Sequence, residues 1–204
     1  MTFLTLPLLV FSSTSTPVAA GRQEPLVCPV AGHEASADGP IYDYRGVRYR
    51  LCCDDCKPIF EKNPAEALKN PMLDGKVSGV FLFDPVSGAP VTKAKSRGSS
   101  DYKGVRFHFL SARNKTEFDA DPKRYGTIPE KEAMFCPVLQ VELRNYYGVN
   151  GFVDHAAVRY YACCAMCFGV MKANIAKFTP NASKHVAPPK ALPVPPAIAK
   201  IAGF

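Results

Sequence analysis

The chain is organised around Tyr49-Arg50-Leu51-Cys52-Cys53-Asp54-Asp55-Cys56, a stretch that it repeats. Residues 160–167, Tyr-Tyr-Ala-Cys-Cys-Ala-Met-Cys, place their cysteines at the same spacing, and Val-Arg precedes both stretches. Each stretch also follows a Cys-Pro-Val tripeptide, which begins at Cys28 and at Cys136. The eight cysteines therefore form two copies of one pattern: Cys28, Cys52, Cys53 and Cys56 in the first, and Cys136, Cys163, Cys164 and Cys167 in the second.

A third copy without cysteines lies between these two. Asp84-Pro85-Val86 stands where the other copies have Cys-Pro-Val, and residues 104–111, Gly-Val-Arg-Phe-His-Phe-Leu-Ser, stand in the place of the cysteine cluster. Self-similarity at a period of about 50 residues is typical of chains built from repeated units. We therefore expect three modules, at residues 21–72, 77–130 and 133–180.

Composition indicates a globular protein whose modules need support beyond their own cores. Of the 204 residues, 47% are hydrophobic and 21% are charged. Modules this small bury little apolar surface and usually depend on a metal ion, on disulfides or on neighbouring units. The net charge of +7 is spread along the chain, and the densest basic group, residues 93–97, has no interleaved aromatics. We therefore expect no nucleic-acid interface.

Each module is expected to contain a β-hairpin followed by a helix. In the first, residues 41–44 and 47–51 resemble strands around the turn dipeptide Arg45-Gly46. Asp54 and Asp55 favour a helix start, and Asn63-Pro64 favours the start of a second, short helix. The expected fold class is α+β, as three tandem small modules of a β-hairpin plus helix.

The expected helices also define which side chains face the core. After Cys56, Ile59 and Phe60 are expected to point inward. The longest helix is expected over residues 164–178, where apolar residues recur at a spacing of three and four. Residues 181–204 are rich in proline, which predicts an extended and mostly disordered tail.

The N-terminus has features of a secretory signal. Residues 1–20 carry no charge, and a short apolar core over residues 3–11 is followed by small residues before Gly21. We expect cleavage before Gly21 and export to the periplasm or beyond the cell, with a buried N-terminal strand as the alternative. We expect no transmembrane segment, because no stretch approaches the about 18 apolar residues that one needs.

The cysteine spacing is suited to a thiophilic metal ion. Side chains three residues apart lie on one face of a helix, so that Cys53 and Cys56 converge, and Cys52 reaches Cys56 one turn away. Thiolates are the preferred ligands of zinc and copper(I). Neighbours on a strand point to opposite faces, so whether both cysteines of each adjacent pair coordinate is left open. Two clusters predict two ions per chain.

Two other uses of the cysteines are considered. Cysteines of exported proteins often form disulfides, such as Cys53–Cys56 or Cys28–Cys52, and the chain would then be a structural protein. Cys-x-x-Cys at a helix start is also the arrangement of thiol–disulfide oxidoreductases, although no adequate βαβ pattern surrounds it. No serine or cysteine nucleophile has a recognisable His and carboxylate partner, so we expect no enzymatic activity.

The middle module resembles a YHS domain, and the outer modules resemble the related TRASH/YHS-like metal-binding type. The resemblance is carried by Asp84-Pro85-Val86-Ser87-Gly88, by residues 102–111, by Phe118 and by Asp121-Pro122-x-x-Tyr125. It implies a treble-clef-like fold and the binding or trafficking of heavy metals such as zinc or copper. A metal transporter or another envelope protein is the partner that such a role implies.

The resemblance also implies which residues hold the ion. Carried over by position, the family's ligands fall on Cys52 and Cys56 in the first module and on Cys163 and Cys167 in the third. Ala31 and Leu139 stand where the family has a further cysteine. In the middle module Ser87, Leu110 and Asn114 occupy the family's cysteine positions, so we expect no ion there and interpret this module as a packed spacer.

Overall fold

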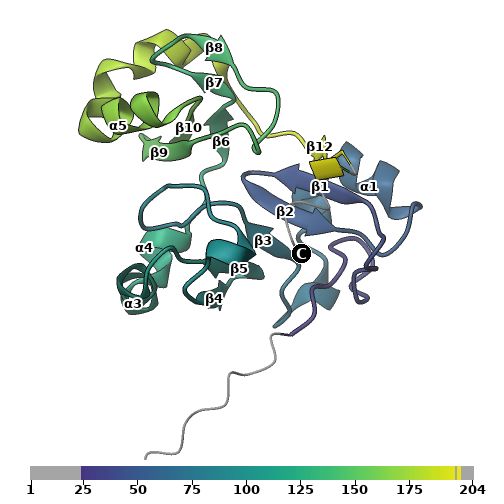
Figure 1. The fold of residues 1–204 in the computed structure, drawn as a ribbon. Helices are drawn as coiled ribbons and strands as arrows, with labels where there is room; N and C mark the ends of the chain where they lie inside the picture. The colour runs from purple at the N-terminus through teal and green to yellow at the C-terminus, as the bar shows by residue number, and fades with distance from the viewer. Residues whose placement is uncertain (1–23, 196, 199–204) are drawn as a thin grey trace, which may run out of the picture.

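The computed structural model describes residues 24–195 and 197–198 of the chain. The segment expected to be a signal peptide, residues 1–20, lies outside the described residues. Within the described part, a β-hairpin followed by a helix occurs three times, and we call the parts around these hairpins the first, middle and third units (Figure 1). Helices and strands are mixed, as expected for an α+β protein.

The first unit contains one hairpin and two short helices. Its elements are β1 (Ile41–Tyr44), β2 (Val47–Arg50), α1 (Cys56–Lys62) and α2 (Pro64–Ala67), followed by the 3₁₀ turn η1 (Pro71–Leu73). The predicted cap at Asn63 is confirmed, because its side chain accepts a hydrogen bond from the amide of Glu66. The prediction for Ile59 is wrong: Ile59 is exposed, since Cys56 and Phe60, four residues apart, form the buried face of α1.

The middle unit has the same order of hairpin and helices. Its elements are β3 (Gly79–Phe81), η2 (Lys93–Lys95), β4 (Ser99–Tyr102), β5 (Val105–His108), α3 (Ala112–Ala120) and α4 (Pro122–Gly126). Ser111 caps α3 by accepting a hydrogen bond from the amide of Asn114, and Asp121 caps α4 by accepting one from Arg124. Asp121 therefore caps the second helix of the middle unit, as Asn63 caps the second helix of the first unit.

The third unit is the most elaborate. Its elements are β6 (Lys131–Ala133), β7 (Phe135–Cys136), β8 (Val141–Glu142), β9 (Gly151–His155), β10 (Val158–Ala162), α5 (Ala165–Asn174), η3 (Ile175–Lys177), η4 (Thr179–His185) and β11 (Val186–Ala187), and β12 (Leu192–Pro193) follows. The expected helix over 164–178 ends early, because the side chain of Asn174 accepts a hydrogen bond from the amide of Lys177 and starts η3.

The tail differs from its prediction in the described residues. Instead of an extended, disordered segment, β11 pairs with β6 and β12 pairs with β1, so the chain returns from the third unit to the first. Ala182 in η4 is fully buried. These strands are two residues long, too short to show a periodic pattern in the sequence.

The structure has two main sheets, and one of them connects two units. A six-stranded sheet has the order β12-β1-β2-β3-β5-β4, in which β2 runs antiparallel to β3 and β3 runs parallel to β5. The first and middle units therefore share one sheet. A four-stranded sheet, β11-β6-β10-β9, belongs to the third unit, and β7 pairs with β8 separately. Figure 1 shows the third unit above the shared sheet.

The three hairpins turn in the same way. Both central residues of each turn have positive φ: 57° and 71° at Arg45-Gly46, 48° and 75° at Lys103-Gly104, and 49° and 60° at Ala156-Ala157. Positive φ at both positions is the geometry of a type I′ turn, whose twist matches that of the flanking strands. The prediction of a tight hairpin at Arg45-Gly46 is thus confirmed.

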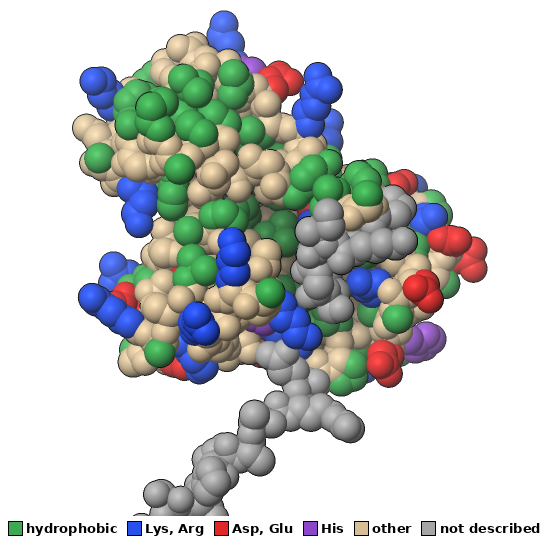
Figure 2. Space-filling model, viewed as in Figure 1, with side chains coloured by type: hydrophobic (Ala, Val, Ile, Leu, Met, Phe, Trp, Pro, Cys, Tyr) green, Lys and Arg blue, Asp and Glu red, His purple; other side chains and the backbone are tan. Residues whose placement is uncertain are grey.

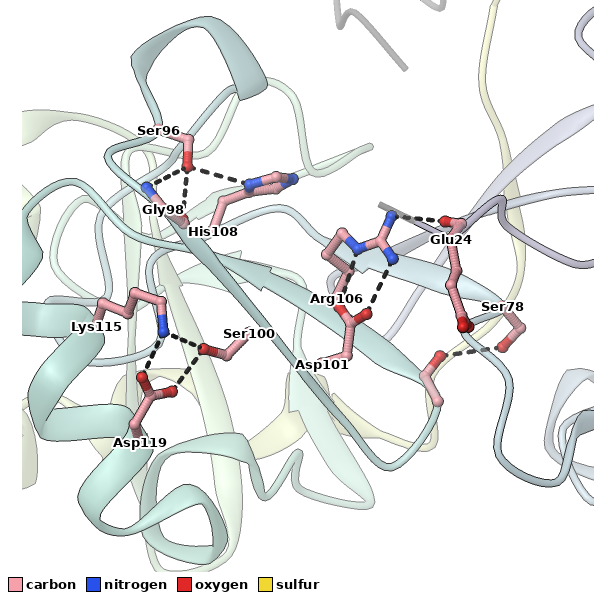
Figure 3. A network of polar contacts seen from close by, with 11 residues as sticks. Glu24, Ser78, Ser96, Gly98, Ser100, Asp101, Arg106, His108, Lys115 and Asp119 are labelled. Atoms are coloured by element: carbon pink, nitrogen blue, oxygen red, sulfur yellow. Dashed lines mark hydrogen bonds and ion pairs between the residues drawn. The ribbon is translucent and has the colours of Figure 1, made fainter. Parts of the chain in front are cut away.

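An arginine and an aspartate face each other across every hairpin. Arg106 donates to both carboxylate oxygens of Asp101, at 2.9 Å each, as Figure 3 shows. The same two-point contact joins Arg48 to Asp43 and Arg159 to Asp154. Bidentate pairs of this kind fix orientation as well as adding energy. The Val-Arg dipeptide of the repeated stretch therefore has a structural role in holding the strand register.

The units share an aromatic core. Phe81 and Phe83 of the middle unit contact Phe152 of the third unit, with ring centroids 5.7 Å and 5.4 Å apart. Tyr161 lies 6.0 Å from Phe83, again measured between ring centroids. The cluster of buried residues that contains these rings also includes Tyr44 and other residues of the first unit. One core therefore spans all three units.

Basic side chains are spread over the surface. Figure 2 shows Lys and Arg side chains scattered over the visible face of the molecule. Among the described residues, no helix is both long enough and apolar enough to cross a membrane.

Candidate metal centres

Three cysteines of the first unit meet at the start of α1. Cys28 lies in the turn before β1, Cys52 follows β2, and Cys56 is the first residue of α1. Their sulfur atoms all lie within 4.8 Å of one another. Cys28 and Cys56 are 0% and 5% exposed, and Cys52 is half-buried. We call these three residues the first triad.

The sulfur spacing in this group suits a thiolate metal site. The sulfur of Cys56 lies 3.6 Å from that of Cys52 and 3.5 Å from that of Cys53, and the latter two are 3.8 Å apart. Thiolates placed tetrahedrally at about 2.3 Å from zinc lie about 3.8 Å from each other. The same distances exceed the about 2.05 Å of a disulfide bond, so no two of these sulfurs are bonded to each other in the structure. These residues therefore fit a thiophilic ion.

The third unit contains a matching group. Cys136 in β7, Cys163 after β10 and Cys167 in α5 have sulfur atoms within 4.8 Å of one another. Cys163 and Cys167 are separated by 3.8 Å between their sulfurs. Cys136 and Cys167 are both 0% exposed. We call these three residues the second triad.

The second cysteine of each adjacent pair lies at the edge of its triad. Cys164 is the N-cap of α5, and its sulfur accepts a hydrogen bond from the amide of Cys167 at 3.4 Å. Cys53 is exposed beside Cys52 and Cys56. In the structure, one cysteine of each adjacent pair belongs to a triad, and the other lies beside it.

The turn that carries the first triad member has one geometry in all three units. The carbonyl of its first residue accepts a hydrogen bond, at 2.8 Å, from the amide four residues later, and this later residue has positive φ. The pairs are Cys28 with Gly32, Asp84 with Gly88, and Cys136 with Gln140. This reversal directs the first side chain of each turn towards the end of the hairpin.

In the middle unit, a buried carboxylate replaces the thiol. One oxygen of Asp84 accepts hydrogen bonds from the amides of Val86 and Ser87, at 3.0 Å each. The other accepts from the amide of Leu110 and from the side-chain nitrogen of Asn114, at 2.7 Å each. Asp84 is fully buried. These residues fill the triad positions: Asp84 corresponds to Cys28, Leu110 to Cys52 and Asn114 to Cys56.

Backbone amides form the same cradle around Cys136. Burial acts to raise the pKa of this thiol, but hydrogen bonds from the amides of Leu139, Cys163 and Val138 outweigh it and lower the pKa. In the repeated pattern these three positions correspond to Ser87, Leu110 and Val86, the amide donors to Asp84. The cradle therefore favours the thiolate of Cys136 in the third unit, and the corresponding amides bind the carboxyl group of Asp84 in the middle unit.

The remaining thiols form two groups: those whose pKa is raised by burial, and those whose pKa is lowered by hydrogen bonds. Burial raises the pKa of Cys56 and of Cys167, and it raises the pKa of Cys163 to about 11. The pKa of Cys53 is lowered by hydrogen bonds from the thiol and amide of Cys56, and that of Cys164 by the amide of Cys167. A metal ion must displace protons from the buried thiols, so binding at these sites is favoured by higher pH.

One part of the chain is similar to a known domain family. A family model of the YHS domain matches residues 82–127, which contain β4, β5, α3 and α4. This match agrees with the resemblance drawn from Asp84-Pro85-Val86-Ser87-Gly88. Comparison with the curated proteins and with solved structures gave no match. The matched segment is the one without cysteines, whereas both triads lie outside it.

Of the eight cysteines predicted as ligands, six form the triads and Cys53 and Cys164 lie beside them. The family positions Cys52 with Cys56 and Cys163 with Cys167 fall within the triads. Sequence reasoning missed the network around Asp84. Its signal was available, because aspartate and asparagine replace the first and last triad cysteines together.

Proposed function

We propose that this protein binds and carries a thiophilic metal ion, zinc or copper(I), at two thiolate sites. The observation that carries the proposal is the pair of three-cysteine groups, each with all its sulfurs within 4.8 Å. The YHS match supports it, because this domain suggests heavy-metal binding. The ligands are Cys28, Cys52 and Cys56 at one site and Cys136, Cys163 and Cys167 at the other, giving two ions per chain.

We also propose that the three units are copies of one domain of the YHS/TRASH-like, treble-clef-like type. The common hairpin turn, the common Arg–Asp pair and the common amide cradle support this proposal. The middle copy has exchanged its ligands for the Asp84–Asn114 network and binds no ion. Its role is to hold the two loaded units at a fixed separation.

The residues around each site have distinct tasks. The amide cradle favours the thiolate of Cys136, and the two buried cysteines of each triad keep water from most of the site. The half-buried Cys52 and Cys163 lie on the side open to exchange. A site that is shielded on one side and open on the other suits an ion that is carried and released.

The proposed place of action is outside the cytoplasm. Residues 1–20 are proposed as the signal for export, and the protein is proposed to act in the periplasm or as a secreted protein. A metal transporter or another envelope protein is the proposed partner. The proposed role is binding and delivery, without an enzymatic reaction.

Elemental analysis with thiol counting tests this proposal. Protein purified from its native compartment under anaerobic conditions should contain two zinc or copper ions per chain and, after unfolding with a chelator, eight titratable thiols. Protein with no ion and no free thiols would instead be a disulfide-stapled structural protein. Turnover in a disulfide-reductase assay would support the oxidoreductase alternative.

A further inference from the structure

The two members of each adjacent cysteine pair have different surroundings. Cys52 and Cys163 belong to the triads, whereas Cys53 and Cys164 lie outside them. The sulfur of Cys53 is nevertheless within 3.8 Å of a triad sulfur on each side, at Cys52 and Cys56. The first triad therefore has an additional sulfur at its solvent edge, and the half-buried Cys164 holds the corresponding position beside the second triad.

Ser111 shows that a residue in this position can cap the following helix without a sulfur atom. Its hydroxyl accepts the amide hydrogen of Asn114 at 3.1 Å, in the way that the sulfur of Cys164 accepts that of Cys167. Serine is among the favoured N-cap residues, and a thiol is a weaker acceptor. Thiols stand at this position only in the two units that have a triad, Cys53 in the first and Cys164 in the third. These thiols therefore occur in the units that have a triad, and the helix alone does not account for them.

Burial limits which sulfur atom can first contact a large molecule that delivers a metal ion. The two deepest triad members are 0% and 5% exposed in the first unit, and both are 0% exposed in the third. A thiophilic ion that arrives on a thiol carrier brings its ligands with it, and sulfur exchange depends on access to the attacking thiol. Cys53 is the exposed thiol of the first group. It is therefore the sulfur that such a complex meets first.

We propose that Cys53 and Cys164 are receiving thiols, which take a thiophilic ion from a thiol-bound carrier complex and pass it to the adjacent triad. This inference rests on the proposed function. In the first step, the bond from the ion to the carrier sulfur breaks as a bond to Cys53 forms; Cys53 loses its proton and the carrier thiolate takes one up. In the second, the three triad thiols bind the ion and lose three protons; Cys53 is released and takes up one of them, and the other two pass to solvent. No electrons are transferred.

Alkylation of the zinc-loaded full chain tests the resting arrangement. Iodoacetamide should modify Cys53 and Cys164, while the six triad cysteines are protected, with the modified positions mapped by peptide mass spectrometry. Protection of all eight cysteines would overturn the inference, because Cys53 and Cys164 would then be permanent ligands.

Transfer kinetics test the receiving role. The variant Cys53→Ser/Cys164→Ser keeps a hydroxyl acceptor at the N-cap of α5 and in the turn that precedes α1, and Ser111 fills the corresponding position in the middle unit. It should still bind two ions at equilibrium, but load from the copper(I)–glutathione complex at least about tenfold more slowly, because the accessible thiol is gone. The matched control Asp55→Ser/Met166→Ser changes exposed neighbours on the same turns and should load like the parent protein.

The outcomes separate the two proposals. Loss of bound ion in the serine variant, or an unchanged loading rate, would overturn the receiving role while leaving the metal sites in place. A parent protein that binds neither zinc nor copper(I) would overturn the proposed function and this inference together.

Discussion

The side chain of Asn114 donates a hydrogen bond to Asp84 at 2.7 Å, and these two residues occupy the places of the last and first triad cysteines. The middle unit thus keeps the arrangement of a metal site, but hydrogen bonds between its side chains take the place of bonds to an ion. A carboxylate that accepts four hydrogen bonds is a strong internal link, because bonds to charged groups exceed those between neutral groups. A single buried carboxylate therefore links the turn, the end of the hairpin and the helix. In the other two units, a triad would link the same three elements through a bound ion.

Removing this carboxylate should destabilise the protein. In Asp84→Ala, four part-buried donors lose their acceptor. An unsatisfied buried group costs about 1–3 kcal/mol, and we expect a total loss of about 4 kcal/mol, at the low end of that range for each donor because water reaches part-buried groups. Urea unfolding of the metal-loaded protein measures the change. Asp119→Ala is the control: Asp119 pairs with Lys115 near the surface, and such pairs contribute at most about 1 kcal/mol. Equal stabilities of the two variants would contradict the structural role of Asp84.

Cysteines should restore a metal site in the middle unit. The variant Asp84→Cys/Leu110→Cys/Asn114→Cys places three thiols on a backbone that already has the turn, the cradle and the helix start of the other units. We expect three ions per chain by elemental analysis in place of two. The same positions changed to serine serve as the control and should leave the count at two. A count of two in the cysteine variant would show that the middle unit has lost more than its ligands.

The two natural sites should lose their ions independently. Cys56 and Cys167 are the triad members that lie in helices, one in each unit. Cys56→Ser and Cys167→Ser should each reduce the bound metal from two ions to one, and the double variant should bind none. Loss of both ions in either single variant would show that the sites depend on each other. Elemental analysis after gel filtration supplies the measurement.

Glu132 should give the protein a characteristic pH dependence. Burial raises the pKa of this carboxyl above 4.5, although hydrogen bonds from Tyr146 and Tyr161 act in the opposite direction. In the window between the unfolded and folded pKa values, the folded state binds more protons than the unfolded state. The stability from this group is therefore fully present below about 4.5 and is lost as the pH rises through the folded pKa.

A neutral replacement isolates this contribution. Glu132→Gln cannot titrate, so the stability of the parent protein relative to the variant should fall as the pH rises from the unfolded pKa through the raised folded pKa. Urea unfolding of both proteins at each pH gives the difference, and the effects of protons on the metal sites cancel in it. A difference that does not change with pH would show that the pKa of Glu132 is not raised in the folded protein.

The local features of the fold could be predicted from the sequence, and the long-range ones could not. Arg45-Gly46 indicated a hairpin because a glycine readily adopts the positive φ that the turn requires. The cap at Asn63 was equally local. The pairing of β2 with β3, and of β12 with β1, joins segments far apart in the chain and depends on packing that no local pattern records.

The candidate sites show the same division. Spacing alone placed the cysteines of each unit together, because helical geometry fixes which residues converge. It did not distinguish Cys52 from Cys53, since that choice depends on where α1 begins: at Cys56, after a bend that turns one thiol inward and leaves the other exposed. The anion cradle was also hidden, because it consists of backbone amides, such as that of Leu110, which any residue provides.

The last prediction concerns the interpretation of the middle unit as a packed spacer. Its rings contact a neighbouring unit: Phe81 and Phe83 contact Phe152, and the guanidinium of Arg159 lies 5.1 Å from the centre of the Phe81 ring. On the other side, β3 takes its antiparallel partner β2 from the first unit. Expressed alone, residues 77–130 would expose these surfaces and lose that pairing.

Such a fragment should not fold by itself. A core of this size seldom supplies more than about 3–5 kcal/mol, and burying one phenylalanine contributes about 1.5–3 kcal/mol, so exposing Phe81 and Phe83 removes most of the margin. We expect little dispersion of its amide NMR signals, with or without zinc. A longer fragment, residues 77–187, restores the contact with Phe152 and contains the second triad, and it should gain dispersed signals when zinc is added. A well-dispersed spectrum from residues 77–130 alone would refute the spacer role, because the network around Asp84 would then suffice to hold an independent domain.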